Sequence, residues 1–304
     1  MQTPQLRIAW APEYHHPLPN NHRFPMEKYS LLPEQLLYEG TLEEKHFFTP
    51  TLLSEEHILA VHDNAYWQNL KSLNLSPQEA RRTGFPLSDE LITRERIIAQ
   101  GSLQNALDAL ENGIACNISG GTHHAFSYKG EGFCLLNDIA IAAKFLLKEK
   151  KVNQILVIDL DVHQGDGTAQ IFQNEPKVFT FSMHGEKNYP LRKEKSDLDV
   201  GLPDGISDQA YLQLLSQHLY PTIERVQPDF IFYQAGVDIL AHDKLGRLNV
   251  SIQGCRQRDK MVLEVAKNNK IPITISMGGG YNKYIQHLIE AHANTFRLVQ
   301  EIFF

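Results

Sequence analysis

The sequence is poor in cysteine, and its cysteines show no pairing pattern. Cys116, Cys134 and Cys255 lie far apart and form no C-x-x-C pair, so neither a disulfide framework nor a thiolate zinc site is expected. Long hydrophobic runs are absent too, because no stretch approaches the roughly 18 apolar residues that a membrane span requires. The N-terminal MQTPQLRIAW lacks the charged and apolar regions of a signal peptide. We therefore expect a cytoplasmic protein with no membrane contact.

An excess of positive charge is also lacking. The chain carries 36 acidic and 29 basic residues, for a net charge of −7, whereas nucleic-acid binding needs clustered lysine and arginine. Nucleic acid is therefore not an expected partner. The 304 residues suit one large α/β domain or two small ones. Because no repeat, low-complexity segment or linker divides them, we expect a single domain over 1–304.

What the sequence does have is a regular alternation of short apolar runs with helical stretches. This alternation predicts an α/β domain in which a parallel β-sheet has helices on both faces. Gly113 stands directly after one helical stretch, in the usual C-terminal position. We expect strands at 6–10, 114–119, 155–158, 178–182, 230–234 and 273–276, helices at 54–70, 94–112, 139–151, 168–173, 207–226, 256–268 and 285–300, and polar connections at 11–25, 75–89 and 183–204.

The segment 155–167, ILVIDLDVHQGDG, is the centre of this pattern. Its apolar beginning is typical of a buried strand, and acidic and histidine residues follow at once. In extended chain, alternate residues project to the same side, so Asp161 and His163 can reach one metal ion together. Carboxylate oxygen and imidazole nitrogen are ordinary zinc ligands. A lone D-x-H is more often a strand followed by a solvated acidic turn, so the rest of the chain has to decide.

Further polar clusters also stand directly after expected strands. In an open parallel sheet the ligand crevice lies beyond the carboxyl ends of the strands, so these clusters can converge on one site. Taken singly, a His-His pair is usually a loop feature, G-G-G-Y is usually a turn, and an aspartate often caps a helix. These non-functional interpretations would all have to be correct in the same chain. We therefore favour the alternative, in which the clusters converge on one site. The clusters are His123/His124, Asp161/His163, Ser182/His184, Asp238 and Tyr281.

Asp161, His163 and Asp238 would make a zinc site of two carboxylates and one imidazole, with water completing the shell. The charge of the two carboxylates balances Zn²⁺ and leaves the ion a moderate Lewis acid. Such an ion can polarise a carbonyl group and lower the pKa of water. The same ligands also accept Fe²⁺, so the residues leave the native metal open.

Five further residues suit proton transfer and charge stabilisation around such a metal. The adjacent His123 and His124 cannot both bind the metal easily if Asp238 does, and imidazole titrates near neutral pH. Asp159 and Asp166 can each accept an imidazole N–H and so set the tautomer of a ring. Tyr281, which follows three glycines, can donate its phenolic O–H to a developing oxyanion.

With these residues in place, the chain resembles the zinc-dependent histone deacetylase family. The resemblance depends on five runs that occur in this order: SGGTHHAFSYKGEGFCLLNDIAIA, VIDLDVHQGDGTAQIF, FSMHGEKNYP, YQAGVDILAHDKLG and MGGGY. It covers at least 118–281 and, more weakly, the N-terminal third. The runs QAGVDILAHDKLGRL and NYP are most similar to the class IV branch and its bacterial relatives. The family implies the arginase/deacetylase fold and hydrolysis of an N-acyl amide, typically acetyl-lysine.

Carried over residue by residue, the zinc ligands of the family match Asp161, His163 and Asp238. His124, with Asp166 behind it, resembles the general base that activates water and later protonates the leaving amine. His123, with Asp159 behind it, is similar to the histidine that stays an electrostatic helper. Tyr281 matches the tyrosine that polarises the amide carbonyl.

The resemblance also implies a narrow tunnel for acyl-lysine and a monovalent-cation site, usually potassium, beside the metal. In the tunnel wall, Tyr189 stands where class I members commonly have phenylalanine. The matching wall residues are Gly132, Phe133, Tyr189 and Leu245. The matching residues of the cation site are Asp159, Asp161, His163, Ser182 and Met183.

Two features of the family are harder to match. Many members carry an aspartate at the tunnel rim that clamps the substrate backbone, and Asp89 is only a candidate for it. Some members place an arginine beside an internal acetate exit, and Arg23 in HRFPM is a candidate for that position. Cys134, next to Phe133, is interpreted as a packed small residue rather than a nucleophile.

Several functions stay open at this stage. The leading hypothesis is a zinc hydrolase that acts on acyl-lysine in a protein or peptide. Alternatives among enzymes are deacylation of a small acylated amine such as an acetylpolyamine, and removal of long fatty acyl groups. An arginase-like binuclear manganese hydrolase would need another carboxylate cluster at a strand end, and the run directly after Val237 offers only Asp238 and, five residues on, Asp243. A catalytically inactive binding module would be expected to lack a metal ligand, a dyad histidine or the tyrosine, and all are present.

Overall fold

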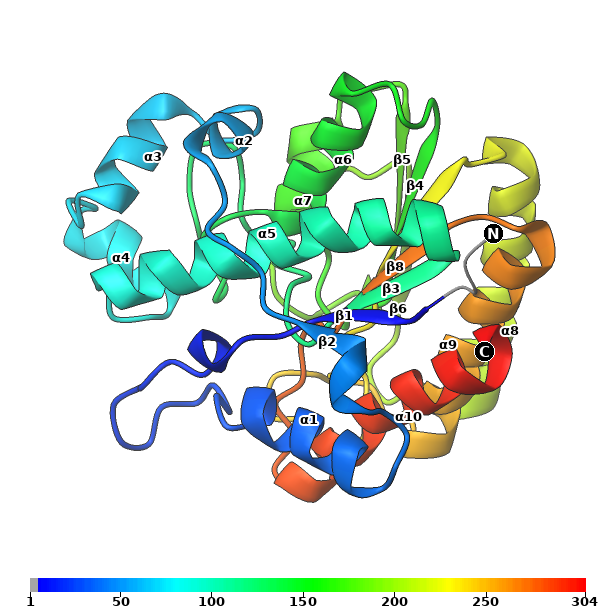
Figure 1. Cartoon of the computed structure of the whole chain (residues 1–304). Helices are drawn as coiled ribbons and strands as arrows, with labels where there is room; N and C mark the ends of the chain where they lie inside the picture. Colours follow the sequence, from blue (N-terminus) through cyan, green and yellow to red (C-terminus); the bar gives the residue numbers. More distant parts are fainter. Residues whose placement is uncertain (1–4) are drawn as a thin grey trace.

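A single eight-stranded β-sheet forms the centre of the molecule (Figure 1). The computed structural model describes residues 5–304. The strands lie in the order β2-β1-β3-β8-β7-β4-β5-β6, and every neighbouring pair is parallel. The strands are β1 (Arg7–Ala9), β2 (Phe47–Phe48), β3 (Ile114–Asn117), β4 (Ile155–Asp159), β5 (Val178–Gly185), β6 (Leu198–Leu202), β7 (Phe230–Gln234) and β8 (Ile273–Ser276).

Helices cover both faces of this sheet, as the sequence predicted. One group consists of α5, α6 and α7, which pack in succession, and the other of α1, α8, α9 and α10. In Figure 1 the two groups lie on opposite sides of the strands. The helices are α1 (Lys28–Tyr38), α2 (Glu55–Leu59), α3 (Asn64–Lys71), α4 (Pro77–Thr83), α5 (Asp89–Asn112), α6 (Asp138–Lys148), α7 (Asp166–Phe172), α8 (Asp208–Val226), α9 (Ile252–Asn269) and α10 (Ile285–Phe303). None of the helices in residues 5–304 has the length and hydropathy needed to cross a bilayer.

The central strands are buried along their whole length. All residues of β3, β4, β7 and β8 are buried, because helices cover the sheet on both sides. A strand buried on both faces needs a continuous apolar run rather than an alternating one. This is why the runs at 230–234 and 273–276 predicted β7 and β8 with the correct ends.

Several expected elements were wrong in detail. The helix expected at 54–70 is two helices, α2 and α3, and α1 lies where no element was expected. The connection expected at 183–204 contains the end of β5 and the edge strand β6. The connection expected at 75–89 contains α4, which has only seven residues and no apolar periodicity. Its signals are local: Ser76 and Glu79 form a capping box, and Gly84 ends the helix in the left-handed conformation.

One buried arginine holds the ends of two central strands together. Arg258 on α9 is fully buried. Its guanidinium donates to the carbonyl oxygens of Leu160, after β4, and of Ala235 and Gly236, after β7. It also donates to the carboxylate of Asp259 at 2.8 Å. Because all strands are parallel, these carbonyls lie at the same edge of the sheet as the polar clusters.

Replacing Arg258 with methionine should lower the free energy of unfolding by about 3–5 kcal/mol. The variant leaves Asp259 charged and buried and three carbonyl groups without their donor. Arg256, also on α9, pairs with the exposed carboxylate of Glu301 at 2.7 Å, so Arg256→Met should cost less than about 1 kcal/mol. Urea unfolding of both variants measures the difference. Equal losses would show that Arg258 contributes no more than a surface ion pair.

Candidate functional site

Three buried side chains lie together beyond the ends of β4 and β7. Asp161, His163 and Asp238 each offer one ligand atom, and these atoms all lie within 4.8 Å of one another. His163 Nδ1 is 3.0 Å from Asp161 Oδ1 and 3.2 Å from Asp238 Oδ2. In the described part of the chain this is the one group of three or more such residues with that geometry. A single cation can therefore contact all three.

The backbone here differs from the extended chain that the sequence predicted. β4 ends at Asp159, and Asp161, Val162 and His163 form a bend. Asp159 Oδ1 accepts a hydrogen bond from Asp161 N at 3.2 Å, and Asp161 Oδ1 accepts one from His163 N at 3.0 Å. Aspartate favours such bonds to the backbone two residues on. The bend, rather than the alternation of a strand, brings Asp161 and His163 to one point.

Donors hold both carboxylates and leave one oxygen without a partner. Asp161 Oδ2 accepts from Gln234 Nε2 at 2.9 Å and from Gly279 N at 3.0 Å. Asp238 Oδ1 accepts from Val162 N at 2.8 Å, whereas Asp238 Oδ2 is buried and has no hydrogen bond. A Cβ at Gly279 would overlap both carboxylates, so only glycine lets this turn approach them. The buried oxygen without a donor is what a bound cation would satisfy.

The electrostatics of the cluster also favour a bound cation. Burial and the neighbouring charge of Asp161 raise the pKa of Asp238 to about 7. Burial lowers the pKa of His163, but the carboxylates of Asp161 and Asp238 outweigh it and raise that pKa to about 10. Two carboxylates in a buried site thus require positive charge between them. The donor set of two carboxylates and one imidazole fits Zn²⁺ or Fe²⁺.

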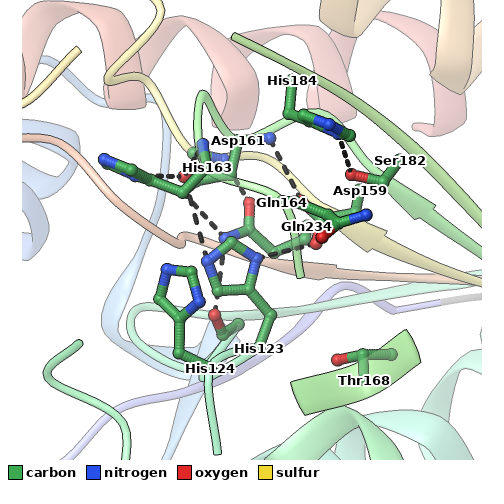
Figure 2. Close-up of polar contacts among 12 residues, drawn as sticks. His123, His124, Asp159, Asp161, His163, Gln164, Thr168, Ser182, His184 and Gln234 are labelled. Atoms are coloured by element: carbon green, nitrogen blue, oxygen red, sulfur yellow. Dashed lines mark hydrogen bonds and ion pairs between the residues drawn. The ribbon is translucent and has the colours of Figure 1, made fainter. Parts of the chain in front are cut away.

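The two histidines after β3 lie beside this cluster (Figure 2), and each has its own carboxylate. His123 Nδ1 is 2.7 Å from Asp159 Oδ2, and His124 Nδ1 is 2.6 Å from Asp166 Oδ1. The centroids of the two rings are 4.2 Å apart. Each Nδ1–H therefore donates to a carboxylate, and the Nε2 of each ring is left for other partners.

The surroundings of the two histidines differ in charge. Burial lowers the pKa of His123, but Asp159 and Asp161 outweigh it and raise that pKa to about 9. The pKa of His124 is lowered, first by burial and then by the positive charge of His123. At neutral pH His123 is therefore the cationic ring and His124 the neutral one. The arrangement separates a fixed positive charge from a group that can accept a proton.

The turn that carries both histidines is anchored by Asp138, a residue that the sequence analysis did not single out. Asp138 begins α6 and is fully buried. Its carboxylate accepts hydrogen bonds from Gly121 N at 3.1 Å, Thr122 N at 2.8 Å and Thr122 Oγ1 at 2.6 Å. The one available signal was its place at the expected start of a helix, where aspartate is common.

The chain after the turn is held by His62, which lies between α2 and α3. The carbonyl of Phe126 accepts from His62 Nδ1 at 3.0 Å, and Asn137 N donates to His62 Nε2 at 3.0 Å. These partners require the neutral ring with its proton on Nδ1. Burial lowers the pKa of His62 to about 4. The ring thus joins the segment after the dyad to the start of α6 only while it is uncharged.

Tyr281 reaches the cluster from the loop after β8. Its backbone N–H donates to Asp243 Oδ2 at 2.7 Å, and its ring centroid lies 6.4 Å from that of His163. Asp243 Oδ1 also accepts from the N–H groups of Leu245 and Gly246, at 2.8 and 2.9 Å. Asp243 therefore positions both Tyr281 and the loop that follows Asp238. In the sequence it was noted only as an acidic residue too isolated to complete a binuclear metal cluster, and the structure gives its carboxylate to backbone donors.

An outer cavity of about 290 Å³ leads from the surface to these residues. The four residues predicted as tunnel walls all line it, together with His124, His163 and Tyr281; the four are Gly132, Phe133, Tyr189 and Leu245. Phe133 has a left-handed backbone with φ 68°, which is uncommon for a large side chain. The wall segment 132–133 is held to α4, because Gly132 N donates to Arg82 O at 3.0 Å and Phe133 N to Thr83 O at 2.8 Å.

A small inner cavity of about 40 Å³ adjoins the outer one and shares part of its lining, including His124, His163 and Tyr281. Arg94 lines it, whereas Arg23, the candidate for an internal arginine, lines the outer cavity. That assignment was therefore wrong, because the loop before α1 places Arg23 against the outer wall. Asp89, the candidate rim aspartate, is exposed at the start of α5 and does not line the outer cavity.

Buried Lys28 on α1 lies beside Tyr281 and was also missed by the sequence analysis. Its Nζ donates to the carbonyl of Gly278 at 3.1 Å and lies 5.7 Å from the centroid of the Tyr281 ring. It thereby ties the first helix to the glycine turn that presents Tyr281. Lysine is rarely fully buried, but sequence alone does not show which lysine will be.

The residues predicted for a monovalent cation are adjacent at the ends of β4 and β5. Asp159 pairs with Ser182 in the register of the two strands, and Met183 follows on β5. The Ser182 hydroxyl lies 2.9 Å from His184 Nδ1 (Figure 2). Asp161 and His163 belong to the cluster described above. A potassium ion at this place stays a prediction.

Protonation of His62 should destabilise the protein as the pH falls. The folded-state pKa of about 4 lies below the ordinary value of 6.5, so the unfolded chain binds the proton first. The stabilisation is complete above pH 6.5 and declines toward pH 4, by about 3 kcal/mol for this group. The free energy of unfolding should therefore fall less steeply over this range in His62→Gln. The exposed His287→Gln should keep the slope of the parent, and equal slopes in all three proteins would contradict the assignment.

Comparison with known proteins identifies the family to which this geometry belongs. The family model "Histone deacetylase domain" matches residues 22–297. An uncharacterized protein of Picosynechococcus sp. is 42% identical over 296 residues, which cover 97% of this chain and 99% of that protein. Histone deacetylase 2 of Arabidopsis thaliana is 31% identical over 274 residues, which cover 86% of this chain and 70% of that protein.

A solved structure shows the same fold. The crystal structure of an HDAC homolog complexed with SAHA superposes with a TM-score of 0.82, over 97% of this chain and 83% of that one, at 24% identity. The resemblance to the class IV branch stays a prediction. By the match over residues 22–297 and by these relatives, the chain belongs to the histone deacetylase family, and this membership supports hydrolysis of an amide bond.

Proposed function

We propose that the protein is a zinc-dependent hydrolase that removes acyl groups from the side-chain amine of lysine. One observation carries the proposal. The acidic cluster, the two histidines and Tyr281 meet at the inner end of a cavity whose walls are largely apolar. A lysine side chain is a long apolar stem, so a narrow apolar passage would admit it and bring its terminal amide to the polar groups.

Asp161, His163 and Asp238 would hold the zinc ion through two carboxylates and His163 Nδ1. When bound, the ion supplies Lewis acidity, which polarises the amide carbonyl and lowers the pKa of water. Gln234 and Gly279 keep Asp161 in place through hydrogen bonds of 2.9 and 3.0 Å. Donors of this kind are typically important for metal affinity, because they fix the orientation of the ligand.

His124 is the residue that we assign to proton transfer. Its Nδ1 is engaged with Asp166 at 2.6 Å, so Nε2 is the atom that can take a proton from water. The carboxylate of Asp166 then stabilises the imidazolium, and the same Nε2 can pass the proton to the leaving amine. A ring that is neutral before the reaction is required for the first of these steps.

His123 has a different part in the proposal. It lies between two carboxylates, with Nδ1 2.7 Å from Asp159 Oδ2 and Nε2 3.9 Å from Asp161 Oδ1. A ring held in this way stays positively charged and is a poor base. We assign it to stabilising the negative charge that develops when water attacks the carbonyl.

Tyr281 is assigned to the oxygen of the substrate carbonyl. Burial raises the pKa of its hydroxyl well above the ordinary value, and the charges of Asp238 and Asp161 raise it further. The phenol therefore stays protonated and can donate a hydrogen bond to an oxyanion. Asp243 holds its backbone N–H, and Lys28 holds the carbonyl of Gly278 in the preceding glycine turn, which limits the reorganisation needed during the reaction.

A substrate panel tests the proposal. It contains acetyl-, octanoyl- and myristoyl-lysine peptides and acetylated spermidine, with the zinc-loaded protein and Asp161→Ala compared. We expect hydrolysis of an acyl-lysine peptide that is lost in Asp161→Ala, lost on chelation and restored by zinc. Zinc stoichiometry is measured in parallel. Preference for spermidine would move the protein to small-molecule deacylation, and absence of turnover with zinc bound would favour a binding module.

Removing the hydroxyl of Tyr281 should lower kcat by about 10²–10³, with a smaller effect on KM. An oxyanion donor acts mainly in the transition state, and this range is typical for the loss of one such donor. Tyr284, three residues further on, is an exposed tyrosine, so Tyr284→Phe serves as the matched control. Steady-state kinetics on the best peptide of the panel measure both variants. Full activity of Tyr281→Phe would refute the assigned role.

A further inference from the structure

The opening of the outer cavity carries two arginines that the proposed chemistry does not use. Arg23 lies against the wall, with its guanidinium carbon 4.9 Å from the centroid of the Phe133 ring. Arg82, at the end of α4, also lines the cavity, and its carbonyl accepts a hydrogen bond from Gly132 N at 3.0 Å. Both residues are exposed. Arg23 contacts the wall segment 132–133 through its side chain and Arg82 through its backbone carbonyl, so both residues belong to the entrance.

Neither of these two arginines forms an ion pair within residues 5–304. The arginine ion pairs in residues 5–304 involve Arg7, Arg94, Arg247, Arg256, Arg258 and Arg297. The acidic side chain in the lining, Glu131, is paired with Lys129 Nζ at 3.1 Å. Glu79, three residues before Arg82, accepts from Ser76 N at 2.8 Å and so caps α4; its pKa is lowered by the hydrogen bonds with Ser76 and, more weakly, by the charge of Arg82, with which it forms no ion pair. The entrance is therefore positive, although the whole chain has a net charge of −7.

We infer that Arg23 and Arg82 recognise a carboxylate that the substrate carries just outside the tunnel. The inference depends on the proposed function, because it names the class of acyl-lysine substrate that the entrance prefers. Guanidinium groups bind carboxylates through two parallel hydrogen bonds, and a guanidinium stacked on an aromatic ring is already partly ordered. A polyamine, which is a polycation, would meet repulsion at the same place. The entrance thus favours acidic acyl-lysine substrates over acetylpolyamines.

The carboxylate has two sources. It is either the side chain of an aspartate or glutamate next to acyl-lysine in a peptide, or the α-carboxylate of free acyl-lysine. Both sources place a negative charge a few bonds from the lysine Cα, where a substrate emerges from the tunnel. The experiment therefore has one arm for each source, and each arm compares two substrates that differ only in that charge.

The first arm uses two acyl-lysine peptides that differ by aspartate or asparagine beside the acyl-lysine. The second arm compares Nα-acetylated acyl-lysine as its free acid and as its amide. The substrates of both arms carry the acyl group that the protein prefers in the substrate panel. Exposed ion pairs contribute little binding energy. We therefore expect KM to be roughly fivefold lower for the negatively charged substrate of each pair than for the neutral one, with kcat nearly unchanged. The difference should shrink at about 0.5 M salt, because exposed charges are screened.

Variants assign the effect to the two arginines. Arg23→Gln and Arg82→Gln should each reduce the preference, and the double variant should abolish it. Arg81, also exposed on α4, does not line the cavity, so Arg81→Gln should keep the preference of the parent. Equal KM values for charged and neutral members in both arms would overturn the inference. So would a preference that survives in the double variant, or one that Arg81→Gln removes as effectively.

Binding measurements separate this inference from the proposed function. Fluorescence anisotropy of labelled aspartate and asparagine peptides with the zinc-loaded protein needs no turnover. If no substrate of the panel is hydrolysed, the proposed function fails, and an arginine-dependent preference for the aspartate peptide in binding would still support the charged entrance. If the neutral peptide is hydrolysed and bound as well as the charged one, the function stands and the inference fails.

Discussion

The closeness of two buried carboxylates is the constraint on which the rest of the site depends. Asp161 and Asp238 face each other across His163, away from bulk water. Such a pair is unstable unless donors and positive charge surround it. Gln234, Gly279 and Val162 supply donors, but Asp238 Oδ2, 3.2 Å from His163 Nδ1, accepts no hydrogen bond. The protein thus maintains an unsatisfied negative site, which is the physical basis for binding a cation.

The surrounding scaffold has to keep these loops rigid, because the ligands come from two strand ends, Asp161 and His163 after β4 and Asp238 after β7. Arg258 on α9 holds two of these loops by donating hydrogen bonds to the carbonyls just before Asp161 and Asp238. Asp138 and His62 do so around the two histidines, and Asp243 and Lys28 do so for Tyr281. Most of these contacts are between a buried polar side chain and backbone groups. They are satisfied only in one arrangement of the loops, which favours a preorganised site over a mobile one.

Sequence reasoning succeeded where a residue type carries its own structural meaning. Apolar runs buried on both faces predicted β7 and β8 to the residue, and Gly113 was predicted as the end of α5. It failed for two short elements: α4, which has cap residues but no apolar periodicity, and the edge strand β6, which depends on pairing with β5. Asp161 and His163 were grouped for a reason that proved incorrect. The chain bends there through the hydrogen bond from His163 N to Asp161, a contact that periodicity does not reveal.

The sequence by itself determined the parallel α/β architecture and the set of polar residues at the strand ends, because both follow from local patterns along the chain. It did not show that Lys28 lies under Tyr281, that Asp243 binds backbone rather than metal, or that Arg23 lies at the outer rather than the inner cavity. Only the tertiary structure decided these points. Each depends on a contact between segments distant in sequence, whose partners are selected by packing and by the need to satisfy buried polar groups.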